Sequence, residues 1–243
     1  MSSLDEALQA RLARVHERIS AAARSAGRNP AEISLLAVSK TFGSAHVVAA
    51  TRAGLRAFGE NYVQEGADKI ARVREAVPGA TLAWHFIGPI QSNKTRALAE
   101  SFDWVQSVDR LKLAQRLSAQ RPAVLPPLNV LLQVNISSEA TKSGVPATEV
   151  PALAGAVAQL PRLRLRGLMA IPAPEPDPQV QRRPLARMRE LFQSLQRGGL
   201  AIDTLSMGMS DDLEAAILEG ATLVRIGTAI FGRRAEDPAG RIA

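Results

Sequence analysis

The feature that most constrains the fold of this chain is a strand–helix alternation that repeats eight times. Each short apolar segment is followed by a stretch with helical periodicity. The eight segments are residues 33–38, 56–59, 82–88, 103–108, 128–136, 164–171, 203–208 and 222–227. Strands that alternate with helices indicate a parallel sheet with right-handed crossovers. Before the first unit, residues 3–26 carry one apolar stripe, which predicts an extra N-terminal helix.

Eight such units in 243 residues predict a single α/β domain, 1–243, folded as a (β/α)8 TIM barrel. An open, doubly wound sheet is the alternative, but no G-x-G-x-x-G sequence follows the first strand. No linker divides the chain. We interpret the proline-rich stretch 172–178 as a rim loop, and we expect Pro184 to kink the helix that follows.

The composition excludes several classes of protein. The chain has no cysteine and three histidines, so we expect neither disulfides nor a metal centre. Of its 30 basic residues 25 are arginines, and the net charge of +7 first suggests a polyanion partner. Because aromatic residues are only 4% and the arginines are interleaved with acids, we do not expect nucleic-acid binding. With no signal peptide and no long apolar run, we expect a cytoplasmic protein that does not enter membranes.

Lys40 is the sharpest candidate for chemistry, since it directly follows the first strand and active sites of barrels lie at that end of the strands. A low-dielectric surrounding would lower its pKa and leave the neutral amine that Schiff-base formation needs. The alternative is a lysine that extends to the rim toward a carboxylate. Lysine is rare here, with five in the chain, which favours a specific role.

Two loops after the last strands have the small residues typical of phosphate sites in barrels. Ser206 to Ser210 follow the seventh strand, and Gly227 with Thr228 follow the eighth. Tight turns with capping residues would explain the same pattern. Arg225 precedes Gly227 on the same strand face, so it should point inward toward either a ligand or a barrel carboxylate.

Other strand ends carry weaker signals, each with a structural alternative. His85 could pack against a planar ligand or be a hydrogen-bonded core histidine, and Asn61 could contact a ligand or cap a helix. Met169 stands at the end of the sixth strand. Tyr62, the only tyrosine, could simply pack on its helix.

Taken together, the motifs at the strand ends resemble the pyridoxal phosphate homeostasis proteins, a family similar to the barrel domain of alanine racemase. They are AVSKT (37–41), FGENYVQE (58–65), WHFIGPIQSNK (84–94), SVDR (107–110), QVNIS (133–137), TKSG (141–144), GLMAIP (167–172), LSMGMSDDLEAAI (205–217) and VRIGTAIFG (224–232). The resemblance covers nearly the whole chain, in order.

The resemblance implies that Lys40 holds pyridoxal 5′-phosphate (PLP) as a Schiff base. It further implies that the loop from Ser206 to Ser210, with Gly227 and Thr228, holds the phosphate and that Arg225 faces the pyridine nitrogen. Three residues are implied to line the ring: Asn61, His85 and Met169. Lys94 and Lys142 match family positions near the mouth.

A positively charged arginine only donates hydrogen bonds, so it leaves the pyridine nitrogen unprotonated and weakens the cofactor as an electron sink. In related racemases a second domain supplies a tyrosine base; we expect these 243 residues to form a single domain, in which Tyr62 is the only candidate for that base. We therefore expect a non-enzymatic protein that buffers or delivers PLP, with free amino acids or apo-enzymes as acceptors. A racemase or Schiff-base aldolase on the same barrel is the alternative.

Overall fold

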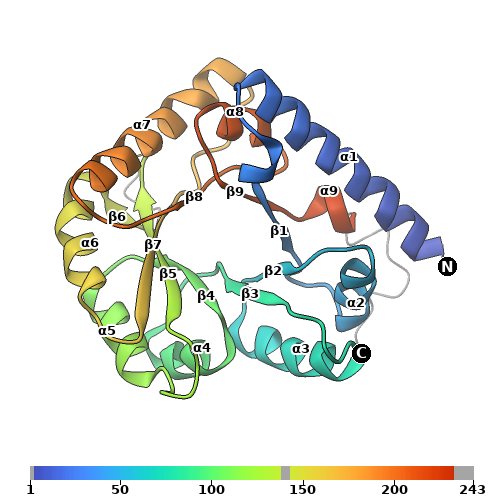
Figure 1. Ribbon diagram of the computed structural model, residues 1–243, viewed down its shortest axis with the longest axis horizontal. Helices are drawn as coiled ribbons and strands as arrows, with labels where there is room; N and C mark the ends of the chain where they lie inside the picture. The colour runs from blue at the N-terminus through green and yellow to red at the C-terminus, as the bar shows by residue number, and fades with distance from the viewer. Residues whose placement is uncertain (1–2, 138–142, 233–243) are drawn as a thin grey trace.

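The computed structural model describes residues 3–137 and 143–232, and its centre is a closed barrel of eight parallel strands (Figure 1). The barrel strands are β1 (Ser34–Val38), β2 (Ala57–Glu60), β3 (Ala83–Phe86), β4 (Trp104–Val108), β5 (Leu128–Asn135), β7 (Leu163–Met169), β8 (Thr204–Ser206) and β9 (Leu223–Ile226). They pair in the order β4-β3-β2-β1-β9-β8-β7-β5, and β5 pairs with β4 to close the ring. The predicted (β/α)8 barrel is thereby confirmed.

Helices surround the barrel as an outer ring (Figure 1). They are α2 (Ser44–Arg52), α3 (Val63–Ala76), α4 (Thr95–Ser101), α5 (Leu111–Gln120), α6 (Val150–Ala158), α7 (Pro178–Arg197), α8 (Leu213–Leu218) and α9 (Thr228–Phe231). The predicted extra helix is α1 (Ser3–Ser25), which packs chiefly against α8 and α9. Its apolar stripe is buried, as expected from the sequence: Leu8, Leu12, Val15 and Ile19.

Two details differ from the sequence-based expectation. A two-residue strand, β6 (Val145–Pro146), pairs with β5 outside the ring, and a segment so short has no periodicity to detect. Strand β8 covers only residues 204–206 of the expected 203–208. Helix α7 runs through Pro184 to Arg197, as expected, and at its start Asp177 accepts a hydrogen bond from the Gln179 N–H (2.8 Å).

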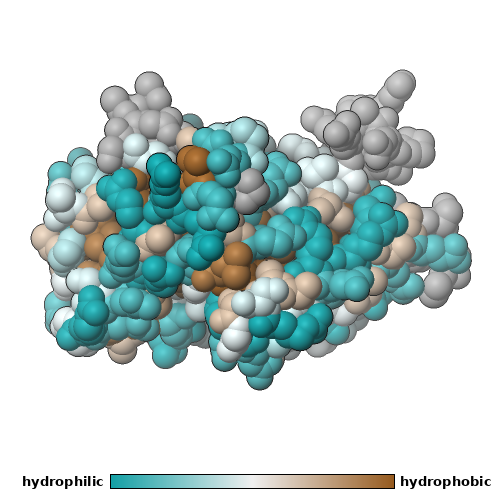
Figure 2. All heavy atoms as spheres, turned by 90° about the horizontal axis from the view of Figure 1, so that it is seen from above, coloured by the Kyte–Doolittle hydropathy of each residue, from teal (hydrophilic) through white to brown (hydrophobic). Residues whose placement is uncertain are grey.

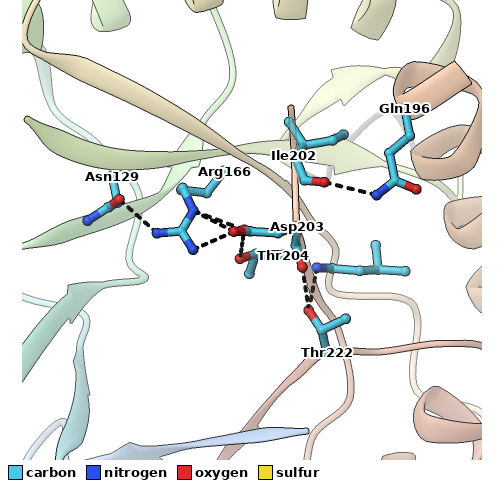
Figure 3. A network of polar contacts seen from close by, with 8 residues as sticks. Asn129, Arg166, Gln196, Ile202, Asp203, Thr204 and Thr222 are labelled. Carbon is cyan, nitrogen blue, oxygen red and sulfur yellow. Dashed lines mark hydrogen bonds and ion pairs between the residues drawn. The ribbon is translucent and has the colours of Figure 1, made fainter. Parts of the chain in front are cut away.

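A polar network joins β5, β7, β8 and β9 near their N-terminal ends (Figure 3). Arg166 of β7 donates to both carboxylate oxygens of Asp203 and to Asn129 of β5 (3.1 Å). Partial burial acts to raise the pKa of Asp203, but the hydrogen bonds from Arg166 and Thr204 outweigh it and lower that pKa. We interpret this network as a contribution to stability, because ligands bind at the opposite end of such barrels.

The visible surface in Figure 2 is mostly hydrophilic, and hydrophobic side chains form small separate spots on it. This is the ordinary pattern of a charged helical exterior. Within the part of the chain that the structure describes, no helix has the length and apolarity to cross a bilayer.

Candidate functional site

A cavity of about 280 Å³ opens at the C-terminal ends of β1, β2, β3, β7, β8 and β9, which is the end where barrels bind ligands. Its volume is just below the usual range for small-molecule sites, about 300–1,000 Å³. The lining residues are Val38, Lys40, Asn61, Ile87, Ile171, Met209, Ser210, Asp211, Arg225, Gly227 and Thr228. The cavity thus combines an amine, a guanidinium, a carboxylate, an amide, two hydroxyls and several apolar side chains.

Lys40 reaches this cavity from a tight turn that follows β1. The Phe42 N–H donates to the Ser39 carbonyl oxygen (3.1 Å), which makes Lys40 and Thr41 the central residues of the turn. Thr41 has a φ of 67°, and such a left-handed conformation costs a β-branched residue about 1–2 kcal/mol. Strain of this kind persists only where surrounding contacts hold it.

The side chain of Lys40 is exposed, and among the described residues no hydrogen bond or ion pair engages its amine. Within that part of the chain, Lys40 has no carboxylate partner of the kind that the structural alternative supposed. The low-dielectric surrounding expected from the sequence is not found, because the side chain of Lys40 is exposed. The amine remains accessible for reaction with a ligand in the cavity.

A cluster of charged side chains contacts this turn from the protein interior. It was not predicted from the sequence. Lys69 of α3 donates to Glu60 Oε1 (2.7 Å), to Glu65 Oε1 (3.1 Å) and to the Ser39 carbonyl oxygen (2.8 Å). Burial raises the pKa of Glu60, and the charge and hydrogen bond of Lys69 only partly offset this. The detectable signals were a rare lysine and the i,i+4 spacing of Glu65 and Lys69.

Arg225 is the second charged group of the cavity, and its guanidinium is buried. It donates to Ser206 Oγ (2.7 Å) and to the Ala170 carbonyl oxygen (2.8 Å). Burial lowers the pKa of Arg225 to about 10, with a smaller opposing effect from Asp212, so the side chain stays positively charged at neutral pH. Among the described residues no carboxylate is salt-bridged to it, so the arginine can still donate to a ligand.

The contacts of Arg225 continue as a hydrogen-bonded chain across the barrel. Ser206 donates to Gln106 Oε1 (2.7 Å), and Gln106 Nε2 contacts His85 Nδ1 (2.8 Å). His85 also stacks on Trp104, with ring centroids 4.9 Å apart. Gln106 is a buried residue that sequence reasoning did not single out, because a lone glutamine in a strand carries no motif.

The structure brings six of the nine predicted site residues to the cavity: Lys40, Asn61, Ser210, Arg225, Gly227 and Thr228. Ser206 lies beneath it as the partner of Arg225. His85 and Met169 are buried in the barrel and do not line this cavity. Lys94 is at the end of a short 3-10 turn, Ser92–Lys94, away from the lining, and Lys142 falls outside the described residues. The described residues contain no cluster of potential metal ligands.

Burial lowers the pKa of His85 to about 3, so we expect this side chain to stay neutral in the folded protein at mildly acidic pH. The unfolded chain would bind a proton near pH 6.5, and the folded chain would not. Below that pH the folded state should therefore lose up to about 1.4 kcal/mol of stability per pH unit from this residue. Urea unfolding at pH 7 and pH 5 tests this, because His85→Gln should flatten the pH dependence. If the free energy of unfolding fell as much between pH 7 and pH 5 in His85→Gln as in the wild type, His85 would not be the source of the pH dependence.

Comparison with known proteins identifies the class and then the family. A family model described as alanine racemase, N-terminal domain, matches residues 2–235, which makes this an alanine racemase-like barrel. The pyridoxal phosphate homeostasis protein of Pseudomonas aeruginosa is 63% identical over 223 residues, covering 92% of this chain and 94% of the relative. That of Escherichia coli K12 is 59% identical, covering 92% and 95%. The chain belongs to the pyridoxal phosphate homeostasis protein family.

Solved structures agree with this assignment. PipY of Synechococcus elongatus, a structure with PLP bound, superposes with a TM-score of 0.79 at 35% identity and covers 93% of this chain and 100% of PipY. An alanine racemase of Clostridium difficile has a TM-score of 0.70 at 17% identity, and the match covers 57% of that longer chain. The racemase likeness shows a common fold and no more.

Proposed function

We propose that this chain binds PLP through a Schiff base on Lys40 and buffers or delivers it, without substantial catalytic turnover. The observation that carries the proposal is that the exposed amine of Lys40, which has no partner among the described residues, shares one small cavity with the buried cation Arg225. When bound, PLP supplies an aldehyde that condenses with a primary amine and a phosphate that favours cationic and hydroxyl donors. The family membership and the PLP-bound PipY structure support the choice of ligand.

The residues present fit this group. Ser210 and Thr228 bring hydroxyls to the same cavity as Lys40, and we assign them with Gly227 to the phosphate. Gly227 adds no side chain to the cavity, and a Cβ at this position would lie only 3.3 Å from the Val38 carbonyl oxygen. Ser206, whose hydroxyl is already engaged by Gln106 and Arg225, would act through Arg225. His85 and Met169 are buried and do not line the cavity, so we propose that they support the lining residues indirectly.

Arg225 and Tyr62 argue for a carrier over a racemase. A racemase needs an acid–base group on each face of the substrate, and Tyr62 is the only tyrosine available. Tyr62 is 57% exposed and lines a different cavity, together with Thr41, Phe42 and Lys69. Arg225, as a fixed donor, disfavours protonation of a ring nitrogen beside it.

The experiment that tests the proposal is the visible spectrum of the purified protein with PLP, before and after a free amino acid is added. We expect a Schiff-base band that the amino acid reduces as PLP is released, since its amine can replace that of Lys40. A protein with no such band would not hold PLP through an amine.

We further expect the α-proton of bound amino acids to exchange with deuterated water no faster in the wild type than in Tyr62→Phe. The reason is that Tyr62 lies outside the Lys40 cavity. Proton NMR of a panel of amino acids measures this exchange. Exchange at catalytic rates that Tyr62→Phe abolishes would favour the racemase instead.

A further inference from the structure

The backbone around Lys40 is fixed at more points than a surface turn requires. The Ser39 carbonyl oxygen accepts from Phe42 within the turn and from Lys69 Nζ outside it. The Ser39 hydroxyl donates to Glu60 Oε1 (2.6 Å). The Ser39 N–H pairs with the Gly59 carbonyl oxygen of β2 (2.9 Å). Every polar group of Ser39 therefore has a partner, immediately before Lys40.

The residue after Lys40 is held by the same cluster. The Thr41 N–H donates to Glu65 Oε1 (2.9 Å), the oxygen that also accepts from Lys69 (3.1 Å). This contact stands at the left-handed residue of the turn, where a threonine is disfavoured. Glu65 thus compensates a strained conformation that determines where the chain turns after Lys40.

Lys69 is the centre from which both contacts are organised. An ammonium group has three donors, and all three find acceptors: Ser39, Glu60 and Glu65. Its side chain is 4% exposed and that of Glu60 is fully buried, so neither is available to bulk solvent. A lysine so completely engaged is not a second site for PLP. It is suited to hold other groups in place.

We propose that Lys69, Glu60 and Glu65 form a clamp that positions Lys40 for Schiff-base formation by fixing Ser39 before it and Thr41 after it. The inference rests on the proposed function and deepens it. A fixed backbone leaves only the Lys40 side chain to order when the covalent bond forms, which lowers the entropic cost of that step. The clamp residues are positioning residues and do not contact the ligand cavity.

The test compares two ligands that share a phosphate and a ring. PLP forms a Schiff base, and pyridoxine 5′-phosphate, which carries an alcohol in place of the aldehyde, does not. In Glu65→Ala, which removes the acceptor of the Thr41 N–H, we expect PLP to bind about tenfold more weakly, while the affinity for pyridoxine 5′-phosphate changes less than about twofold. Glu65 is partly exposed, so this variant should fold.

Glu65→Gln is the matched control, because its amide oxygen can still accept from Thr41, and it should stay close to the wild type. Lys69→Met removes the centre of the clamp and should show at least the same selective loss of PLP affinity. If Glu65→Ala bound PLP as tightly as the wild type does, the proposal would be overturned. An equal loss of affinity for PLP and for pyridoxine 5′-phosphate would also overturn it. A wild-type protein that binds both ligands without a Schiff base would overturn the proposed function itself.

Discussion

Replacing Lys40 by alanine is expected to abolish the Schiff-base band and to weaken PLP binding by about 100-fold or more, because the only covalent contact is lost. Non-covalent binding through Arg225 and the hydroxyls of Ser210 and Thr228 should remain, since they line the cavity independently of Lys40. Absorbance titration and equilibrium dialysis measure the two effects. The melting temperature should change little because the Lys40 side chain is exposed.

Two controls sharpen this result. Lys40→Arg keeps the positive charge but cannot form a Schiff base, so it should resemble Lys40→Ala in its spectrum. Lys112→Arg changes an exposed lysine on α5, far from the cavity lining, and should retain wild-type binding. A Schiff-base band that persists in Lys40→Ala would show that another lysine carries PLP.

Arg225→Met is expected to have the largest effect on stability, lowering the free energy of unfolding by about 2–4 kcal/mol. The substitution leaves the Ser206 hydroxyl oxygen and the Ala170 carbonyl oxygen without their donor in the barrel interior. Relief of the cost of burying a charge offsets part of the loss. PLP affinity should also fall, by about tenfold, because the cavity loses its buried cation.

Denaturant unfolding and PLP titration measure these effects, and Arg164→Met provides the comparison. Arg164 is an exposed arginine on β7, and its loss should change stability by no more than about 0.5 kcal/mol. If Arg225→Met were as stable as Arg164→Met, the hydrogen bonds of Arg225 would not be holding β7 and β8 to β9.

Most of the fold could be predicted from the sequence because strand–helix periodicity is a local property. Strand β5 and helix α1, with long apolar patterns, were placed to within a few residues. The boundaries of β8 and the existence of β6 depend on pairing with distant strands, which no local pattern records.

The site was predictable to the extent that strand ends converge in a barrel. Lys40, Asn61 and Arg225 share one cavity because each lies at, or just past, the C-terminal end of a parallel barrel strand. The clamp around Ser39 and the chain through Gln106 were not predictable, because they depend on side-chain directions set by tertiary packing. The exposure of Lys40 follows likewise from a turn that the cluster behind it holds.

The central claim, that Lys40 is the residue that holds PLP, is tested most directly by borohydride reduction of the wild-type protein with PLP, followed by peptide mapping. Reduction makes the Schiff base permanent, so the modified lysine can be identified by mass. We predict that the phosphopyridoxyl group is found on the peptide that contains Lys40. Its recovery mainly on Lys69, Lys94, Lys112 or Lys142, or on no lysine at all, would contradict the account.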